Sequence, residues 1–329
     1  MNPQLRLAIL SATTVVLFGG MATLLASLVY PGVRVRLAAL PAEARARWVL
    51  AWAAFPWLAS AALLALCFLP SFWSLLGLAV DHCPLHDDGH VHLCLAHAPH
   101  HPVTTIELAL LAAAALGIGA VVLRVIRAQL ATWRAVSALL QVAGDDVHAG
   151  GLVASAEPLS VTAGLVWPLV LVSTGLRNRL APRHVEAVLA HERAHARRRD
   201  PMRLVAVALL GAAYATGTRR LLLSDAALAC EEAADEQAAG VVGDRTVVAE
   251  AIVAVERLLG ERTHQIGLAV GMTGCATEVR VEALLRDPIL PSPAASSSWL
   301  LWVALAAGAL LGASEIHHIT ETVLDLIAR

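Results

Sequence analysis

The stretch His191-Glu192-Arg193-Ala194-His195 decides how the rest of this chain is interpreted. Residues four positions apart on a helix lie on one face, so both imidazoles can reach one metal ion. A glutamate beside the first histidine can take a proton from a metal-bound water and pass it to a leaving amine. The pattern predicts a zinc site on a helix, with His191 and His195 as ligands and Glu192 as the catalytic base. A solvated polar helix face is the alternative.

The neighbouring residues predict that this motif belongs to one amphipathic helix, from Pro182 to Arg199. Proline suits the first turn of a helix, because its missing N–H would have no partner there. Val185, Val188 and Leu189 then form an apolar stripe at helical spacing. The two histidines therefore share a helix that can pack against a core.

A catalytic zinc ion takes three protein ligands and keeps one position open, so a third ligand has to lie outside this helix. The best candidate is Glu231 in the helical segment Cys230-Glu231-Glu232-Ala233-Ala234-Asp235, and Glu232 is the rival. Asp235 lies one turn beyond Glu231 on the same face. Its carboxylate can accept the second ring N–H of a ligating histidine and fix the tautomer. A solvated acidic helix face is the alternative.

Together the two motifs resemble the integral-membrane zinc metallopeptidases of the BlaR/MecR type. Their relatives, the HtpX-like proteases, share the H-E-x-x-H and E-x-x-x-D pair. The resemblance covers roughly Leu159 to Leu285. It implies a zincin-like α+β domain with one catalytic Zn²⁺, in which the first motif supplies two ligands and the base. Glu231 is then the third ligand, and Asp235 orients a ligating histidine.

Enzymes of this type bind substrate as an extended strand beside an edge strand near the zinc. The resemblance assigns that role here to Leu169, Val170, Leu171 and Val172, which could bind a peptide by backbone pairing. In the BlaR/MecR sensors a penicillin-binding domain follows the last membrane span. Only Glu315 to Arg329 follow it here, so we expect no sensing of β-lactams by that route.

The composition indicates a membrane protein. Hydrophobic residues make up 58% of the 329 residues and the mean hydropathy is positive, outside the ordinary soluble range. Since a bilayer crossing takes about 20 apolar residues, we expect four transmembrane helices, at about 7–30, 48–69, 104–126 and 298–314. Pro70 should end the second, with Ser71 to Val80 along the membrane interface. A cleaved signal peptide is the alternative for the first.

The arginines predict the orientation in the membrane. Arginine-rich loops stay in the cytoplasm, and here they lie between the first two spans and after the third. The N-terminus and the loop 81–102 then lie outside. The apolar stretch Leu204 to Thr218 is short for a crossing, and a crossing would separate His191 from Glu231. We therefore expect it to be a domain helix at the bilayer surface.

The predicted fold class is mainly α, a polytopic helical membrane protein with a cytosolic α+β metalloprotease domain that carries a small edge sheet. Residues 1–128 should form the membrane region, residues 129–290 the protease domain, and residues 291–329 a linker, the fourth transmembrane helix and a short external tail. The protein should therefore reside in the cell membrane as a multi-pass protein.

The external loop is the second unusual feature, because residues 81–102 hold half of the chain's 14 histidines. Tracts rich in His and Cys are typical of metal binding, and imidazoles with thiolates suit Cu(I) or Zn(II). We expect a second metal ion or a sensing role here. The candidates are His82, Cys83, His86, His90, His92, Cys94 and His97. Alternatively, Cys83 and Cys94 form a disulfide.

The sequence thus predicts a membrane-embedded zinc endopeptidase that acts on a protein or peptide and contacts the lipid bilayer. The external loop favours a signal-responsive protease, and the resemblance suggests a cytosolic transcriptional repressor as substrate. The alternatives are an HtpX-like quality-control protease and a non-catalytic metal-binding membrane sensor. A net charge of −2 does not support direct nucleic-acid binding. No oxyanion donor is evident, and His264 and Tyr214 are candidates.

Overall fold

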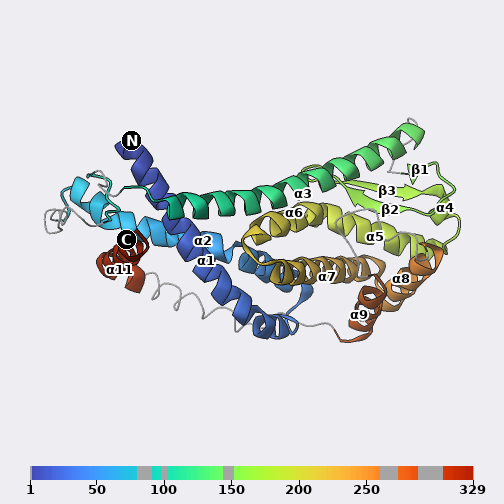
Figure 1. The fold of residues 1–329 in the computed structure, drawn as a ribbon. Helices are drawn as coiled ribbons and strands as arrows, with labels where there is room; N and C mark the ends of the chain where they lie inside the picture. The colour runs from blue at the N-terminus through green and yellow to red at the C-terminus, as the bar shows by residue number, and fades with distance from the viewer. Residues whose placement is uncertain are drawn as a thin grey trace. The chain divides into compact units, whose positions relative to one another are not determined.

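The computed structural model is mainly helical and describes residues 2–79, 91–97, 102–143, 152–259, 273–287 and 307–328 (Figure 1). The chain divides into two compact units. The first comprises Met1–Val29, Ala54–Ala120 and Ser292–Arg329, and the second comprises Tyr30–Ala53 and Val121–Pro291.

Three long helices are apolar enough to cross a membrane: α1 (Pro3–Leu37), α2 (Ala42–Leu75) and α3 (Thr105–Ala143), the last over Thr105–Ala138. Each exceeds the roughly 20 residues that a bilayer crossing requires. They correspond to the first three predicted spans, and the chain therefore has the helices of a membrane-associated protein. Residues 298–306, where the fourth predicted span begins, lie outside the described part of the chain.

The second helix differs from the prediction. Pro70 lies inside α2, which continues to Leu75, so the expected helix end at Pro70 is wrong. Proline removes one backbone hydrogen bond, but ending the helix in an apolar segment would leave several backbone groups without partners. Continuing the helix therefore costs less free energy than ending it at Pro70. Pro56 lies inside the same helix.

The residues that we expected to form a short tail are helical. Helix α11 (Ala313–Ala328) contributes Leu324 to the core of the first unit, together with Leu10, Cys67 and Leu93. The segment 91–97 and α11 therefore belong to one packed cluster, although more than 200 residues of sequence separate the paired side chains of His92 and Glu321.

The second unit contains a small three-stranded sheet with the order β1-β3-β2. Strand β1 (Leu152–Val153) pairs parallel with β3 (Leu169–Ser173), and β2 (Ser160–Ala163) pairs antiparallel with it. The edge position predicted for Leu169, Val170, Leu171 and Val172 is wrong, because β3 is the central strand. Strands β1 and β2 form the two edges of the sheet.

Five helices of the second unit follow the sheet. They are α5 (Pro182–Arg198), α6 (Asp200–Leu210), α7 (Thr216–Val242), α8 (Arg245–Leu259) and α9 (Thr273–Leu285). Helix α5 packs against α7 and α8 on one side and against β2 and β3 on the other (Figure 1). Ala187, Ala190 and Ala238 are buried where α5, α7 and α8 meet. Small side chains allow helix axes to approach closely.

A sharp turn joins α5 to α6. Arg199 ends α5 in the left-handed conformation, with φ 54° and ψ 43°, which is uncommon for a residue other than glycine. The turn places Asp200 at the start of α6, beside the end of α5. Helix α6 has 11 residues and ends at Leu210, so Leu204 to Thr218 is not one continuous span. This agrees with its interpretation as part of the domain.

Candidate active site

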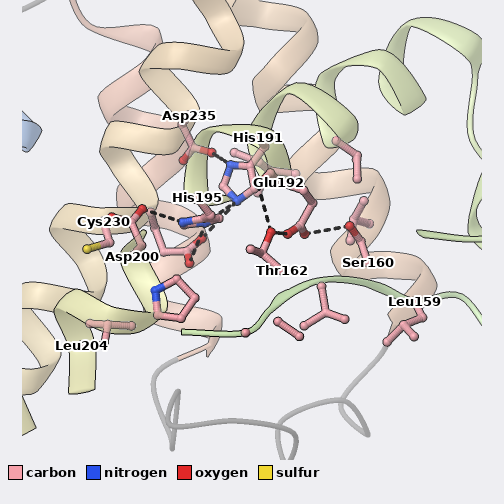
Figure 2. A pocket seen from close by; sticks show the side chains of 18 of the residues that line it. Leu159, Ser160, Thr162, His191, Glu192, His195, Asp200, Leu204, Cys230 and Asp235 are labelled. Atoms are coloured by element: carbon pink, nitrogen blue, oxygen red, sulfur yellow. Dashed lines mark hydrogen bonds and ion pairs between the residues drawn. The ribbon is translucent and has the colours of Figure 1, made fainter. Parts of the chain in front are cut away.

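A cavity of about 440 Å³ in the second unit contains the predicted catalytic residues. It is lined by residues of helices α5 to α9, of strand β2 and of part of α3. Figure 2 shows the two histidines of α5 side by side within it, with Glu192 directed toward β2. The sequence motif therefore faces a concavity rather than bulk solvent.

Three side chains converge as the ligands of one metal ion would. The Nε2 atoms of His191 and His195 lie 3.0 Å apart. Those atoms lie 3.5 Å and 3.4 Å, respectively, from the carboxylate oxygens of Glu231 on α7. One ligand atom from each of the three lies within 4.8 Å of the others. Two imidazole nitrogens and one carboxylate oxygen are the donor set of many catalytic zinc sites.

Two aspartates set the orientation of these imidazoles. Asp235 Oδ1 lies 2.8 Å from His191 Nδ1, and Asp200 Oδ2 lies 2.8 Å from His195 Nδ1 (Figure 2). A proton on each Nδ1 leaves both Nε2 atoms as lone pairs that face each other. Lone pairs at this distance repel unless a cation or a proton lies between them. The arrangement therefore fits a metal ion.

Glu192 is held by the edge strand. The residue is 8% exposed, and its carboxylate accepts hydrogen bonds from Ser160 Oγ at 2.7 Å and Thr162 Oγ1 at 2.6 Å (Figure 2). These two hydroxyls come from alternate residues of β2, which point to the same face of a strand. The carboxylate is thereby fixed beside the two histidines of its own helix.

Arg280 on α9 brings a positive charge to the pocket. Its Nη1 lies 2.9 Å from Glu231 Oε2, and its Nε and Nη2 each lie 2.8 Å from the carboxylate of Asp235. Burial alone would raise the pKa of Glu231, but the charges of Arg280 and His195 hold it well below its usual value. Glu231 therefore stays ionised, as a metal ligand must be.

The pKa of His195 is shifted in the opposite direction, upward. Burial alone would lower its pKa, but the carboxylate of Glu231 and the hydrogen bond to Asp200 raise it from 6.5 to about 10. A cation that binds here has to displace that proton, since only the neutral imidazole ligates metal.

The rival ligand Glu232 points elsewhere. It forms an ion pair with Arg45 in α2 and is not among the three converging ligands. Cys230, beside it, lines the cavity as a buried thiol whose pKa is raised by burial. Tyr214 donates its hydroxyl to the carbonyl oxygen of Trp52 at 2.6 Å and does not line the cavity. His264 lies outside the described residues.

The sequence prediction missed four side chains that contact the predicted site residues: Ser160, Thr162, Asp200 and Arg280. The alternation Ser160-Val161-Thr162 is a strand signal that could have indicated two hydroxyls on one face. Asp200 could have been suspected from the Asp-Pro helix start that follows α5. Nothing in the spacing indicated Arg280, because 45 residues separate it from Asp235.

The predicted external loop is only partly described. His82, Cys83, His86 and His90 lie outside the described residues, and so the Cys83–Cys94 disulfide stays a prediction. Of the remaining candidates, Cys94 Sγ lies 3.7 Å from His97 Nδ1. His92 Nδ1 lies 2.8 Å from Glu321 of α11.

Comparison with known proteins identifies the domain that holds this cavity. Residues 161–285 match the sequence profile of peptidase family M48. No curated protein and no solved structure shows a significant match. The matched range contains Thr162, both histidines, Glu192, Glu231 and Arg280, and a metallopeptidase requires such a base beside a metal-binding group. Residues 161–285 therefore form a peptidase family M48 domain, a metallopeptidase domain, in a chain that also carries helices able to span a membrane.

Proposed function

We propose that the protein is a membrane-embedded zinc endopeptidase, in which His191, His195 and Glu231 bind one catalytic Zn²⁺. The observation that carries this proposal is the convergence of the three donor atoms within 4.8 Å, inside the M48 domain. Two imidazoles and one carboxylate leave a fourth position for water or substrate. Zinc is the ion that this donor set favours, since it prefers nitrogen and oxygen ligands in a tetrahedral site.

The residues around the ligands support peptide hydrolysis. A bound zinc ion would lower the pKa of its water to about 7 and polarise the scissile carbonyl. Glu192 then accepts the proton of the attacking water and returns it to the leaving amine. Ser160 and Thr162 keep its carboxylate turned toward the cavity. Asp200 and Asp235 hold the ligating imidazoles in the tautomer that exposes Nε2.

Strand β2 supports the binding of an extended peptide. Its residues line the cavity, and within the described ranges its one strand partner is β3. A peptide that adds a strand to this edge would lie beside Glu192. This role replaces the one predicted for Leu169–Val172, which lie in the central strand.

The finer proposal concerns location and substrate. The arginine-rich loops support a cytosolic active site in a cell-membrane protein. A histidine-rich segment predicted on the opposite side supports a signal-responsive protease that cleaves a cytosolic regulator, such as a transcriptional repressor. Quality control of membrane proteins is the competing role. Mass spectrometry of cells expressing wild type or Glu192→Gln distinguishes them: one stabilised partner supports signalling, whereas many stabilised membrane proteins support quality control.

The catalytic proposal is tested with the full chain purified in detergent. We expect it to cleave an unfolded protein such as casein, to lose activity with a zinc chelator and to regain it with Zn²⁺. Glu192→Gln should abolish turnover and leave zinc content unchanged. Glu186→Gln, an exposed change on the same helix, is the control and should behave as wild type. Zinc bound by the wild type without any turnover would instead identify a non-catalytic metal-binding protein.

A further inference from the structure

A second group of metal-binding side chains lies in the first unit, outside the M48 domain. It consists of His92 from the segment 91–97 together with His317 and Glu321 from α11. One ligand atom from each lies within 4.8 Å of the others. His317 and Glu321 are four residues apart on one helix and therefore share a face. This is the i, i+4 spacing of His191 and His195, realised on a different helix.

Both imidazoles converge on one carboxylate oxygen. Glu321 Oε1 lies 2.8 Å from His92 Nδ1 and 3.1 Å from His317 Nε2, and it accepts a hydrogen bond from the Leu93 N–H at 2.8 Å. His317 is 0% exposed and Glu321 is 7% exposed. Water therefore does little to stabilise the charge on Glu321, so that charge needs compensation from within the protein.

The hydrogen bond on the far side of His317 determines which ring nitrogen faces Glu321 as an acceptor. His317 Nδ1 lies 2.7 Å from the carbonyl oxygen of Cys67, and a carbonyl oxygen only accepts hydrogen bonds. The proton must therefore sit on Nδ1. In a neutral imidazole, Nε2 then directs its lone pair at the carboxylate of Glu321. The contact is repulsive unless a proton or a metal ion lies between the two groups.

We propose that His92, His317 and Glu321 bind a second divalent metal ion of the zinc class. Ligating histidines commonly donate their other ring N–H to a backbone carbonyl, as His317 does to Cys67. Two imidazoles and one carboxylate suit Zn²⁺ better than Ca²⁺ or Mg²⁺, which prefer all-oxygen sites. The alternative is a buried ion pair with a proton on His317.

The composition of residues 81–102, which include His92, already predicts a metal ion in this loop. The structure assigns ligands to it that the sequence prediction lacked, because two of them lie on α11 rather than in the loop. The bound ion would fasten the segment 91–97 to α11. Its role here is structural, joining two parts of the first unit that are remote in sequence.

The test measures zinc content in the full chain, purified in detergent and dialysed against ZnCl₂. A double variant carrying His191→Ala and His195→Ala lacks the proposed catalytic ligands, so failure of the catalytic site and failure of this site give different results. We expect about two zinc ions per chain in the wild type and about one in the double variant. Adding His317→Ala or His92→Ala should remove the remaining ion.

His318→Ala in the same background is the matched control, because His318 neighbours His317 on α11 but does not belong to the group. It should keep one zinc ion. His92 lies outside any helix, so its substitution is expected to leave α11 folded even if His317→Ala does not. A double variant that binds no zinc overturns the proposal. Zinc retained after His92→Ala also overturns it, since other histidines would then hold the ion.

Discussion

Arg280 donates two hydrogen bonds of 2.8 Å to Asp235, one from Nε and one from Nη2, and its Nη1 forms an ion pair with Glu231. One guanidinium from α9 thus contacts the proposed ligand Glu231 and also Asp235, the carboxylate beside His191. A planar fork of donors matches a carboxylate in a way that a lysine ammonium does not. Side chains of α5, α7 and α9 therefore hold one another in place at this site.

Arg280→Lys should weaken zinc binding by roughly 10- to 100-fold, the usual effect of losing a partner behind a metal ligand. The lysine keeps the charge but cannot hold Asp235 with two hydrogen bonds. Competition with a chromophoric chelator measures the affinity. Arg286→Lys, which affects an exposed ion pair with Glu282, should leave it unchanged. Equal affinities for wild type and Arg280→Lys would mean that the guanidinium does not support the ligands.

Asp200→Asn should lower activity by about 10- to 100-fold, because the amide no longer anchors His195 as a negatively charged acceptor. The loss should appear in zinc affinity as well as in kcat/KM. Asp244→Asn is the control, since its side-chain oxygen accepts a backbone N–H from Thr246 and asparagine can do the same. A fully active Asp200→Asn enzyme would show that Asp200 is not needed to orient His195.

Thr162→Val should reduce kcat by about 10- to 100-fold and leave zinc content unchanged, since hydrogen bonds to a charged group are worth roughly 1.5–3 kcal/mol. Valine has nearly the same shape but cannot donate to Glu192. Thr162→Ser retains the hydroxyl and should recover most of the rate. Loss of zinc from Thr162→Val would point to a packing role for Thr162 rather than orientation of Glu192.

Gly175→Ala should destabilise the second unit by about 1–3 kcal/mol or more. A Cβ at this buried glycine would lie 2.2 Å from the carbonyl oxygen of Ala156, and backbone cannot move aside as a side chain can. Thermal unfolding of the purified chain reports the effect. Gly217→Ala meets nothing within 4 Å and lies in the first turn of α7, so it should be neutral or slightly stabilising. Equal unfolding temperatures for the two variants would contradict this view of Gly175.

Zinc removal should lower the unfolding temperature of the M48 domain. A ligand that binds only the folded state at 1,000 times its Kd stabilises that state by about 4 kcal/mol. The shift should shrink in a His195→Ala variant, which has lost one proposed ligand. A chelator that leaves the unfolding curve of the wild type unchanged would show that the bridging of α5 and α7 by metal contributes nothing to stability.

Parts of this structure could be predicted because they depend on neighbours in sequence. The i, i+4 spacing of His191 and His195 and the proline at the start of α5 involve residues within one helix. The three long apolar helices are similar, since length and composition are enough to indicate them. Glu231 could be predicted as the third ligand because the acidic pair on this helix offers only two candidates, Glu231 and Glu232.

Other parts depend on how the chain folds in three dimensions and cannot be read from one local segment. The sheet order decides which strand faces the cavity, and a run of four apolar residues looks alike at the edge and in the centre. Asp200 reaches His195 only because Arg199 adopts a left-handed conformation. Likewise, the pairing of His92 with Glu321 joins a loop to a helix 229 residues later, which no local pattern indicates.

The edge position of β2 has a consequence for which proteins could be cleaved. A polypeptide can add to a sheet edge only where its own N–H and C=O groups are unengaged, and a folded helix or internal strand has none to offer. On the proposed function, cleavage would then be limited by the local unfolding equilibrium of the target. A signal that loosened a few residues of a partner protein would expose it to cleavage without any change in the enzyme.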